Sequence, residues 1–331
     1  MAYPLAVISE RFGPPDSYEL RNLQPGIPGP REVRIRVKSA GVNFVDVLMA
    51  TGKYQVKLPL PCVPGIECAG IIDAVGEDVS SLAVGDRVLV SQGNGQAFAQ
   101  SRIALAEKAF RIPDAMPFDE AVVFKMNYTT AYHALVQRGH VKPGESLLVL
   151  GASGGVGYAC IELGKALGAF VIASASSPAK RALAKRAGAD MVIDSQSEDW
   201  RGDLKAANQG RPVDVIVDPV GGQMSETAFR SLAWNGRHLM IGFAAGDIPR
   251  LPTNLAILKG AALIGVDVHQ FTVREKQLGL ENLANLFALY EAGKLRPPIG
   301  HRFPLAAFAE AMSLVASGGS VGRVVLDMPD D

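Results

Sequence analysis

Six short apolar runs recur at nearly even intervals through the second half of the chain. They centre on Leu148, Val171, Val192, Val215, Leu239 and Ile264, at spacings of 23, 21, 23, 24 and 25 residues. Each interval is long enough for a crossover helix and its two loops, which consecutive parallel strands require. The pattern therefore predicts an α/β unit in which a doubly wound sheet of six parallel strands carries helices on both faces.

The first 125 or so residues follow a different pattern. Val33, Ile35 and Val37 alternate with charged residues, which is the period of two expected for a strand with one wet face. Two further apolar runs, 65–76 and 86–91, are bounded by turn residues, and no long helical pattern lies near them. We expect a β-rich unit, either a partly open barrel or a folded-over sheet.

The tail of the chain exceeds what a six-stranded unit needs. Beyond Asp267, helical patterns at 274–292 and 304–317 lead into a last apolar run at 322–326. We assign this tail to the first domain. The predicted division is therefore 1–125 with 268–331 as one domain and 126–267 as the other.

Charge and cysteine content exclude several classes of protein. The chain has 33 Lys and Arg residues and 33 Asp and Glu residues, so it lacks the basic footprint of nucleic-acid binding. Its longest run without a formal charge, 146–161, is shorter than the roughly 18 apolar residues of a membrane span. The start shows no secretory pattern, and three cysteines cannot build a disulfide framework. We expect a cytoplasmic protein without nucleic-acid or membrane partners.

A glycine-rich turn follows the first of the six apolar runs. The strand predicted at 147–150 leads directly into Gly151, Ala152, Ser153, Gly154, Gly155, Val156 and Gly157, which open a helix that stops at Gly168. Small residues let the backbone approach a pyrophosphate, whose charge is met by free N–H groups and the positive end of the helix. Gly151, Ser153, Gly154, Gly155, Val156 and Gly157 are thus candidate dinucleotide ligands. The alternative is a glycine turn in an empty strand-helix-strand unit.

The end of the second strand favours a 2′-phosphate over a free ribose. NAD-selective sites place an acidic residue about 20 residues after the turn, but no Asp or Glu occurs between Glu162 and Asp190. The strand instead ends in Ser176 and Ser177, and Lys180 lies in the first turn of the next helix. We predict that Ser176 and Lys180 bind the phosphate of NADPH. The alternative is a solvated basic face.

The glycine turn belongs to a longer series of motifs. In chain order they are 41–46 (GVNFVD), 64–70 (PGIECAG), 85–88 (GDRV), 127–132 (NYTTAY), 151–157 (GASGGVG) and 218–222 (DPVGG). The series resembles the medium-chain dehydrogenases/reductases over essentially the whole chain, and in particular their zinc-independent quinone oxidoreductase branch. The resemblance implies a GroES-like catalytic domain made from both chain ends around a central Rossmann domain, the cofactor NADPH and a homodimer.

The resemblance also bears on metal binding. Related zinc enzymes carry Cys, His and Cys where this chain has Asn43, Ile66 and Met126, and their cluster of four structural cysteines has no counterpart here. Ile and Met supply neither the imidazole nor the thiolate that a catalytic zinc requires. We therefore expect no metal.

The remaining candidates follow from the resemblance alone. It implies that Asn43, Asp46, Tyr54 and Thr130 face the nicotinamide or substrate, and that Gly242, Phe243 and Val266 border the nicotinamide pocket. Each has a structural alternative: Asn43 and Asp46 fix turns, Thr130 caps a helix, Phe243 lies in the core and Tyr54 only shapes the pocket.

Loss of the metal restricts the chemistry. Hydride addition to a simple carbonyl builds alkoxide charge that zinc or a strong acid stabilises, whereas a quinone or an α,β-unsaturated carbonyl delocalises the electron pair itself. The sequence therefore predicts an NADPH-dependent reductase of quinones or enones. Two alternatives remain: an enoyl thioester reductase, and an NADPH-binding structural or regulatory protein without turnover.

Overall fold

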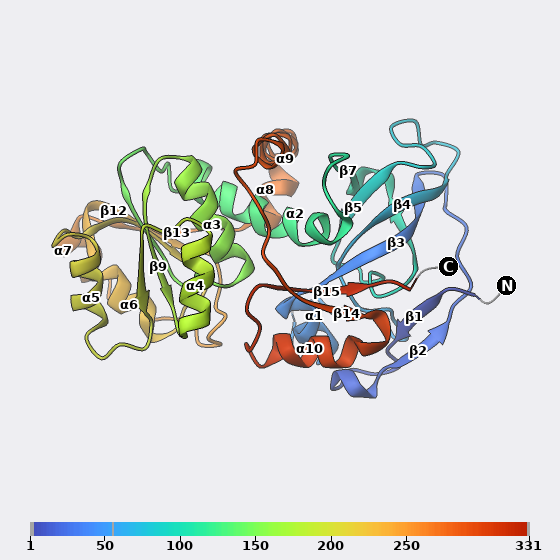
Figure 1. Cartoon of the computed structure of the whole chain (residues 1–331), viewed down its shortest axis with the longest axis horizontal. Helices are drawn as coiled ribbons and strands as arrows, with labels where there is room; N and C mark the ends of the chain where they lie inside the picture. Colours follow the sequence, from blue (N-terminus) through green and yellow to red (C-terminus); the bar gives the residue numbers. More distant parts are fainter. Residues whose placement is uncertain (1–2, 55, 330–331) are drawn as a thin grey trace. The chain divides into compact units, whose positions relative to one another are not determined.

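The computed structural model describes residues 3–54 and 56–329 and divides the chain into two compact units (Figure 1). The first comprises Met1–Lys125 with Pro298–Asp331, and the second comprises Met126–Pro297. Helix α2 (Phe118–Tyr132) begins in the first unit and ends in the second.

The second unit contains the predicted parallel sheet. Its strands lie in the order β10-β9-β8-β11-β12-β13, and every pairing is parallel. This order reverses direction between β8 and β11, where doubly wound folds bind their ligands. The strands are β8 (Ser146–Val149), β9 (Phe170–Ala175), β10 (Met191–Asp194), β11 (Val213–Asp218), β12 (Leu232–Met240) and β13 (Ala262–Gly265). The predicted α/β fold class is confirmed.

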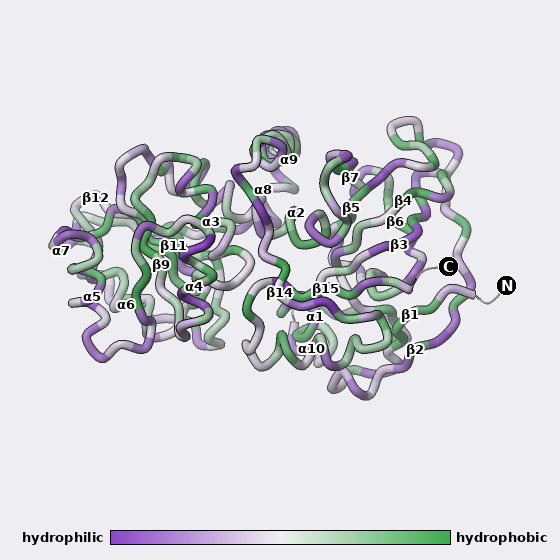
Figure 2. Tube along the Cα trace, in the orientation of Figure 1, coloured by the Kyte–Doolittle hydropathy of each residue, from purple (hydrophilic) through white to green (hydrophobic). Residues whose placement is uncertain are grey.

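Helices cover both faces of this sheet, which explains why its inner strands β8, β9 and β11 are nearly continuous apolar runs. Leu148, Ile172 and Ile216 face one core with residues of α5, α6 and α7. On the other face, Gly164 of α3 lies against Leu147 and Val171. Figure 2 shows hydrophobic colouring along the central strands. The helices are α3 (Gly155–Ala166), α4 (Pro178–Arg186), α5 (Trp200–Ala207), α6 (Gln223–Phe229) and α7 (Asn254–Lys259).

The second unit extends about thirty residues beyond the predicted boundary after Asp267. Helices α8 (Val268–Arg274) and α9 (Lys276–Glu291) belong to it, whereas we expected 268–297 in the first domain. The reason is their contacts with the π-helix at His133–Arg138 that follows α2. Phe271 stacks on His133 at a ring-centroid distance of 4.0 Å, and Asn282 accepts a 3.0 Å hydrogen bond from Gln137.

The first unit is the predicted β-rich domain. Its main sheet has the order β14-β15-β3-β4-β5-β7, with β6 paired to β3, while β1 and β2 form a separate antiparallel pair. The first half of β3 pairs with β6 and its second half with β15, so this long strand joins two parts of the sheet. The strands are β1 (Leu5–Ile8), β2 (Glu19–Asn22), β3 (Glu32–Val42), β4 (Glu67–Val75), β5 (Arg87–Ser91), β6 (Ser101–Leu105), β7 (Ala109–Arg111), β14 (Ile299–Pro304) and β15 (Arg323–Asp327).

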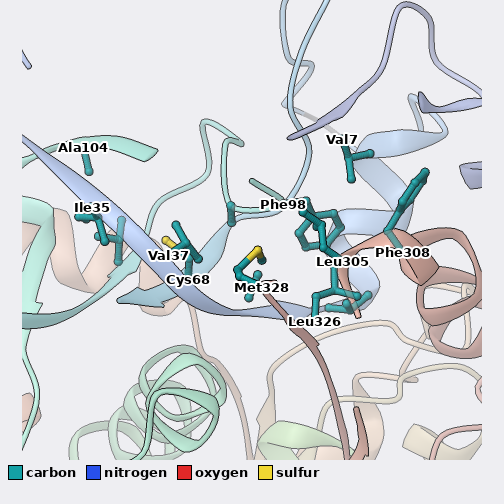
Figure 3. Close-up of a cluster of buried hydrophobic side chains, with 14 of the residues drawn as sticks. Val7, Ile35, Val37, Cys68, Phe98, Ala104, Leu305, Phe308, Leu326 and Met328 are labelled. Atoms are coloured by element: carbon teal, nitrogen blue, oxygen red, sulfur yellow. The ribbon is translucent and has the colours of Figure 1, made fainter. Parts of the chain in front are cut away.

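Both ends of the chain contribute to the core of the first unit. Side chains from β1 and β3 meet Leu305, Phe308 and Leu326 from the carboxyl-terminal segment (Figure 3). Helix α10 (Phe308–Ala316) supplies one wall of this core, and α1 (Phe44–Ala50) packs against it. Asn43, one of the residues predicted to face the nicotinamide or substrate, is the N-cap of α1.

Candidate active site

The glycine turn lies at the carboxyl end of β8, beside the point where the strand order reverses. Gly151 has φ +56°, which favours glycine, and a Cβ on Gly157 would lie 2.4 Å from the carbonyl oxygen of Gly151. Gly154 is the N-cap of α3, so the N–H groups of Gly155, Val156 and Gly157 have no acceptor within the helix. The close packing and free donors fit a pyrophosphate.

Asn127 is a neighbour of this turn that the sequence did not single out. A Cβ on Gly155 would lie 2.3 Å from Asn127 Oδ1, so the Asn127 amide packs directly against the first residue of α3. The side chain is buried. Only the position of Asn127 in the 127–132 motif hinted at a role, because a contact between segments so far apart leaves no local pattern.

The residues predicted to read a 2′-phosphate gather at the end of β9. Ser176 follows this strand, and the Ser177 hydroxyl caps α4 by accepting the Lys180 N–H at 3.3 Å. Arg181 on the same helix forms a 2.9 Å ion pair with Asp194 at the end of β10. Ser176 and Lys180, the two predicted phosphate ligands, thus lie at the junction of β9 and α4, and Arg181 pairs with Asp194.

The other cofactor candidates of the second unit lie at strand ends or on α2. The Thr130 hydroxyl donates a 2.7 Å hydrogen bond to the Met126 carbonyl, and its oxygen can still accept one. Phe243 follows β12 and is 44% exposed, so it is no core residue. Gly242 precedes it, and Val266 follows β13 with its N–H on the Met240 carbonyl.

In the first unit, Asp46 holds two backbone segments together. Its carboxylate accepts the N–H of Asn43 at 2.7 Å and that of Ile66 at 3.0 Å. Burial raises the pKa of Asp46 to about 7, against the effect of the N–H donors, and the nearby Glu67 charge adds to the rise. Asp46 thus fixes the turn that presents Asn43.

The Asn43 side chain bridges two charged residues. Its Nδ2 donates a 3.1 Å hydrogen bond to Glu67 Oε2, and its Oδ1 accepts one from Arg323. Glu67 is buried, with 1% of its surface exposed. Desolvation raises the pKa of Glu67, and the Arg323 charge lowers it. Neither partner was predicted from the sequence, because Glu67 on β4 and Arg323 on β15 lie far from Asn43 along the chain.

Lys125 adds a third charge to this region. Its Nζ lies 4.9 Å from the ring centroid of Phe110. Desolvation lowers the pKa of Lys125, and the negative charge of Glu67 raises it. Glu67 thus lies under the electrostatic influence of two cations, Arg323 and Lys125, with Asn43 and Ser91 as hydrogen-bond donors.

Tyr54 follows α1 in a loop that its backbone N–H anchors on the Leu48 carbonyl at 3.1 Å. The side chain is partly exposed, and its hydroxyl forms no hydrogen bond with another residue that the structure describes. The hydroxyl is therefore available to a ligand.

The residues at the expected zinc positions do not fit a metal. Ile66 has no donor atom, and the Asn43 amide is engaged by Glu67 and Arg323. Within residues 3–54 and 56–329, no three His, Cys, Asp or Glu side chains are grouped so that they could hold an ion. No helix in that part of the chain is long and apolar enough to cross a membrane.

Comparison with known proteins identifies the family. The model of the alcohol dehydrogenase GroES-like domain matches residues 29–113, and that of the zinc-binding dehydrogenases matches 155–284. A quinone oxidoreductase-like protein 2 homolog from Nematostella vectensis is 32% identical over 97% of this chain and 88% of its own length. The chain belongs to the medium-chain dehydrogenase/reductase superfamily, in its quinone oxidoreductase branch.

Further relatives of this branch agree. The quinone oxidoreductase of Pseudomonas aeruginosa is 34% identical, with 95% of this chain and 97% of its own covered. A mycobacterial protein solved in complex with NADPH has a TM-score of 0.88 and 29% identity over 98% of this chain and 99% of its own. The CurK enoyl reductase has a TM-score of 0.87 and 26% identity over 98% and 99%. These matches support an oxidoreductase with a nicotinamide cofactor.

Proposed function

We propose that this medium-chain oxidoreductase uses NADPH to reduce quinones or α,β-unsaturated carbonyl compounds and needs no catalytic metal. The observation that carries the proposal is the polar network of Asn43, Glu67 and Arg323. Two of the positions where related enzymes carry zinc ligands are thus occupied by Ile66, which has no donor atom, and by Asn43, whose amide is hydrogen-bonded to both Glu67 and Arg323. A Lewis acid has no set of ligands there, so the acceptor has to stabilise the incoming electron pair itself.

The second unit supplies the groups that bind the cofactor. The N–H groups at the start of α3 bind the pyrophosphate, and Ser176 and Lys180 bind the 2′-phosphate. When bound, NADPH supplies the hydride. The lack of an Asp or Glu between Glu162 and Asp190, where NAD-selective sites carry one, favours NADPH over NADH.

The first unit supplies hydrogen-bond donors for the acceptor. An asparagine amide carries two N–H groups, and only one of those of Asn43 is used by Glu67. The second N–H and the Tyr54 hydroxyl are the donors for the enolate or quinol oxygen. An enone also needs a proton at carbon after the hydride arrives, and Tyr54 is the group we propose to donate it.

An enoyl thioester reductase is the second candidate. The likeness to an enoyl reductase, CurK, favours it. Conjugate reduction of an enoyl thioester uses the same hydride chemistry, so the two candidates differ in the acceptor alone. The comparison of thioester with free enone under matched conditions separates them.

The test follows NADPH absorbance with purified protein and a panel of benzoquinones, enones and enoyl thioesters. We expect turnover that tracks acceptor electrophilicity. In Tyr54→Phe, the rate should fall more for enones than for quinones, since quinones need no proton at carbon. Binding of NADPH without turnover of any acceptor would refute the proposal and support a structural or regulatory role.

A further inference from the structure

Asp218 ends β11 and accepts four hydrogen bonds, although its side chain is fully buried. Its Oδ1 accepts the N–H groups of Val220 at 2.9 Å and Gly221 at 2.8 Å. Its Oδ2 accepts the Ser225 hydroxyl at 2.6 Å and faces Nε2 of His238 at 2.9 Å. Two of these bonds shape the turn at 219–222, and the other two hold the carboxylate in place.

His238 is a buried residue whose side chain forms a hydrogen bond with Asp218. It lies on β12 with 1% of its surface exposed and stacks on Phe229 at a centroid distance of 5.9 Å. The hydrogen bonds from His238 and Ser225 lower the pKa of Asp218 against the effect of burial, so the carboxylate is ionised and can only accept. The Nε2 atom of His238 therefore carries the proton.

The other ring nitrogen of His238, Nδ1, takes no part in this hydrogen bonding. Nδ1 is buried without a hydrogen-bond partner among the described residues. Burying a polar atom unpaired is unfavourable, and an apolar side chain on this inner strand would avoid that cost. The bond to Asp218 is what distinguishes histidine from an apolar residue at this position.

The turn that Asp218 shapes touches both segments we assign to the cofactor. A Cβ on Gly151 would lie 2.8 Å from Cγ2 of Val220, so Val220 packs against the glycine turn. On its other side, the Val220 carbonyl accepts the Ala245 N–H at 2.9 Å. A Cβ on Gly221 would lie 2.9 Å from Cδ1 of Phe243. Movement of this turn would thus disturb the glycine turn and the Phe243 loop together.

We propose that His238 is a positioning residue for the nicotinamide cofactor, because through Asp218 it fixes the 219–222 turn between the glycine turn and the Phe243 loop. This inference rests on the proposed function. The His238 side chain is buried against Phe229 and Asp218, so we do not expect it to contact the ligand itself. The role needs an N–H donor at this place.

The test compares three variants by NADPH fluorescence titration and steady-state kinetics. His238→Leu removes the donor, and His238→Gln keeps an N–H on a side chain of similar length. His133→Leu is the matched control, since His133 is also buried, its Nδ1 has no hydrogen-bond partner within the described part of the chain, and it packs on Phe271 of α8. We expect His238→Leu to raise the Kd for NADPH about tenfold, His238→Gln to restore most of the affinity and His133→Leu to leave it unchanged.

Two further measurements keep the inference falsifiable. Amide exchange at Val220 and Gly221 should accelerate in His238→Leu and stay slow in His133→Leu, whether or not cofactor is present. If His238→Leu proves unable to fold, Ser225→Ala removes the other donor to the same carboxylate oxygen and should weaken NADPH binding in the same direction.

The outcomes separate this inference from the proposed function. If the unmodified protein binds no NADPH, the proposed function fails. If it binds NADPH and His238→Leu binds equally well, the positioning role is refuted while the function stands. Equal weakening by His133→Leu would also refute it, because the effect would then reflect general loosening of the fold.

Discussion

At the scale of single residues, the first unit relies on polar groups that are far from water. Asp46 joins the backbone of Asn43 to that of Ile66, and Glu67 is held by Asn43 within reach of Arg323. Removing one member of such a network leaves another buried group unpaired, which costs more than the lost bond itself. We therefore expect even conservative substitutions of these residues to be destabilising.

The pKa of Asp46 predicts a pH-dependent stability. Its value in the folded protein, about 7, is above the 3.8 of an exposed aspartate, so folding favours the protonated form. That contribution is complete below about pH 4 and is lost as the pH rises through 7, up to about 4 kcal/mol at about 1.4 kcal/mol per pKa unit. Chemical denaturation across this range should show the loss in the unmodified protein and its absence in Asp46→Asn. Parallel pH profiles of the two proteins would contradict this assignment.

Lys180 is predicted to distinguish NADPH from NADH. Lys180→Ala should raise the Kd for NADPH roughly ten- to hundredfold, because a charge-assisted hydrogen bond contributes about 1.5–3 kcal/mol, and should leave NADH binding nearly unchanged. Lys185→Ala is the control, since the Lys185 ammonium already bonds to the Asp190 carbonyl. Titration of both nucleotides measures the effect. Equal weakening of NADH and NADPH by Lys180→Ala would show that this lysine does not bind the phosphate.

At the scale of elements, α3 sits so close to β8 that only glycine fits between them. Gly157→Ala would place a methyl group 2.4 Å from the Gly151 carbonyl oxygen, and backbone has to move to relieve that contact. We expect a loss of about 1–3 kcal/mol in stability and weaker NADPH binding. Gly265→Ala, where a Cβ meets nothing within 4 Å, should stay within about 0.5 kcal/mol. Denaturant titration of both variants checks the pair, and an unaffected Gly157→Ala would refute the packing argument.

The same elements show what the sequence could predict. The inner strands β8, β9 and β11 were recognisable because burial on both faces makes each a nearly uninterrupted apolar run, and the even spacing of the runs indicated the more exposed strands β10 and β13. The predicted domain boundary differed from the observed one because the sequence of an apolar helix face does not reveal which neighbour it packs against. In the structure, α8 and α9 pack on the π-helix of the second unit. Nothing in the sequence around Phe271 and Asn282 indicated that these residues would contact the π-helix.

The site was predictable only in part, and the reason is distance along the chain. The glycine turn is local, so strand, turn and helix could be read together. Asn43 and Arg323, by contrast, are separated by 280 residues, and no local pattern connects them. Glu67 lay within a recognised motif, but its partners emerged only from the structure.

At the scale of the whole molecule, the second unit has an exposed edge that we expect a second copy to cover. β13 ends the sheet order, and its Leu263 is 52% exposed. Nearby in the chain, Ile257 and Leu258 are 82% and 71% exposed. An exposed apolar strand at the edge of a sheet promotes pairing with another chain. The simplest closed assembly is a dimer in which the same edge of two copies pairs about a two-fold axis.

This edge predicts a homodimer that a charge should disrupt. Leu263→Arg should convert the dimer into a monomer, because it places a like charge on both copies of the paired edge. Met191→Arg, on β10 at the opposite edge of the sheet, should leave the dimer intact. Light scattering after size exclusion measures both. A monodisperse monomer for the unmodified protein would refute the homodimer.

The central claim is that the protein carries out conjugate reduction without a metal. The most direct test measures the reduction of conjugated acceptors and the oxidation of simple alcohols, each with and without a zinc chelator. The account predicts NADPH oxidation with benzoquinones or activated enones at a rate the chelator does not change, and negligible NADP⁺ reduction with simple alcohols. The donor set at Asn43 and Ile66 is the reason, since it offers no ligands for a metal that alcohol oxidation would require. Efficient oxidation of simple alcohols, abolished by the chelator and accompanied by no turnover of conjugated acceptors, would contradict the account.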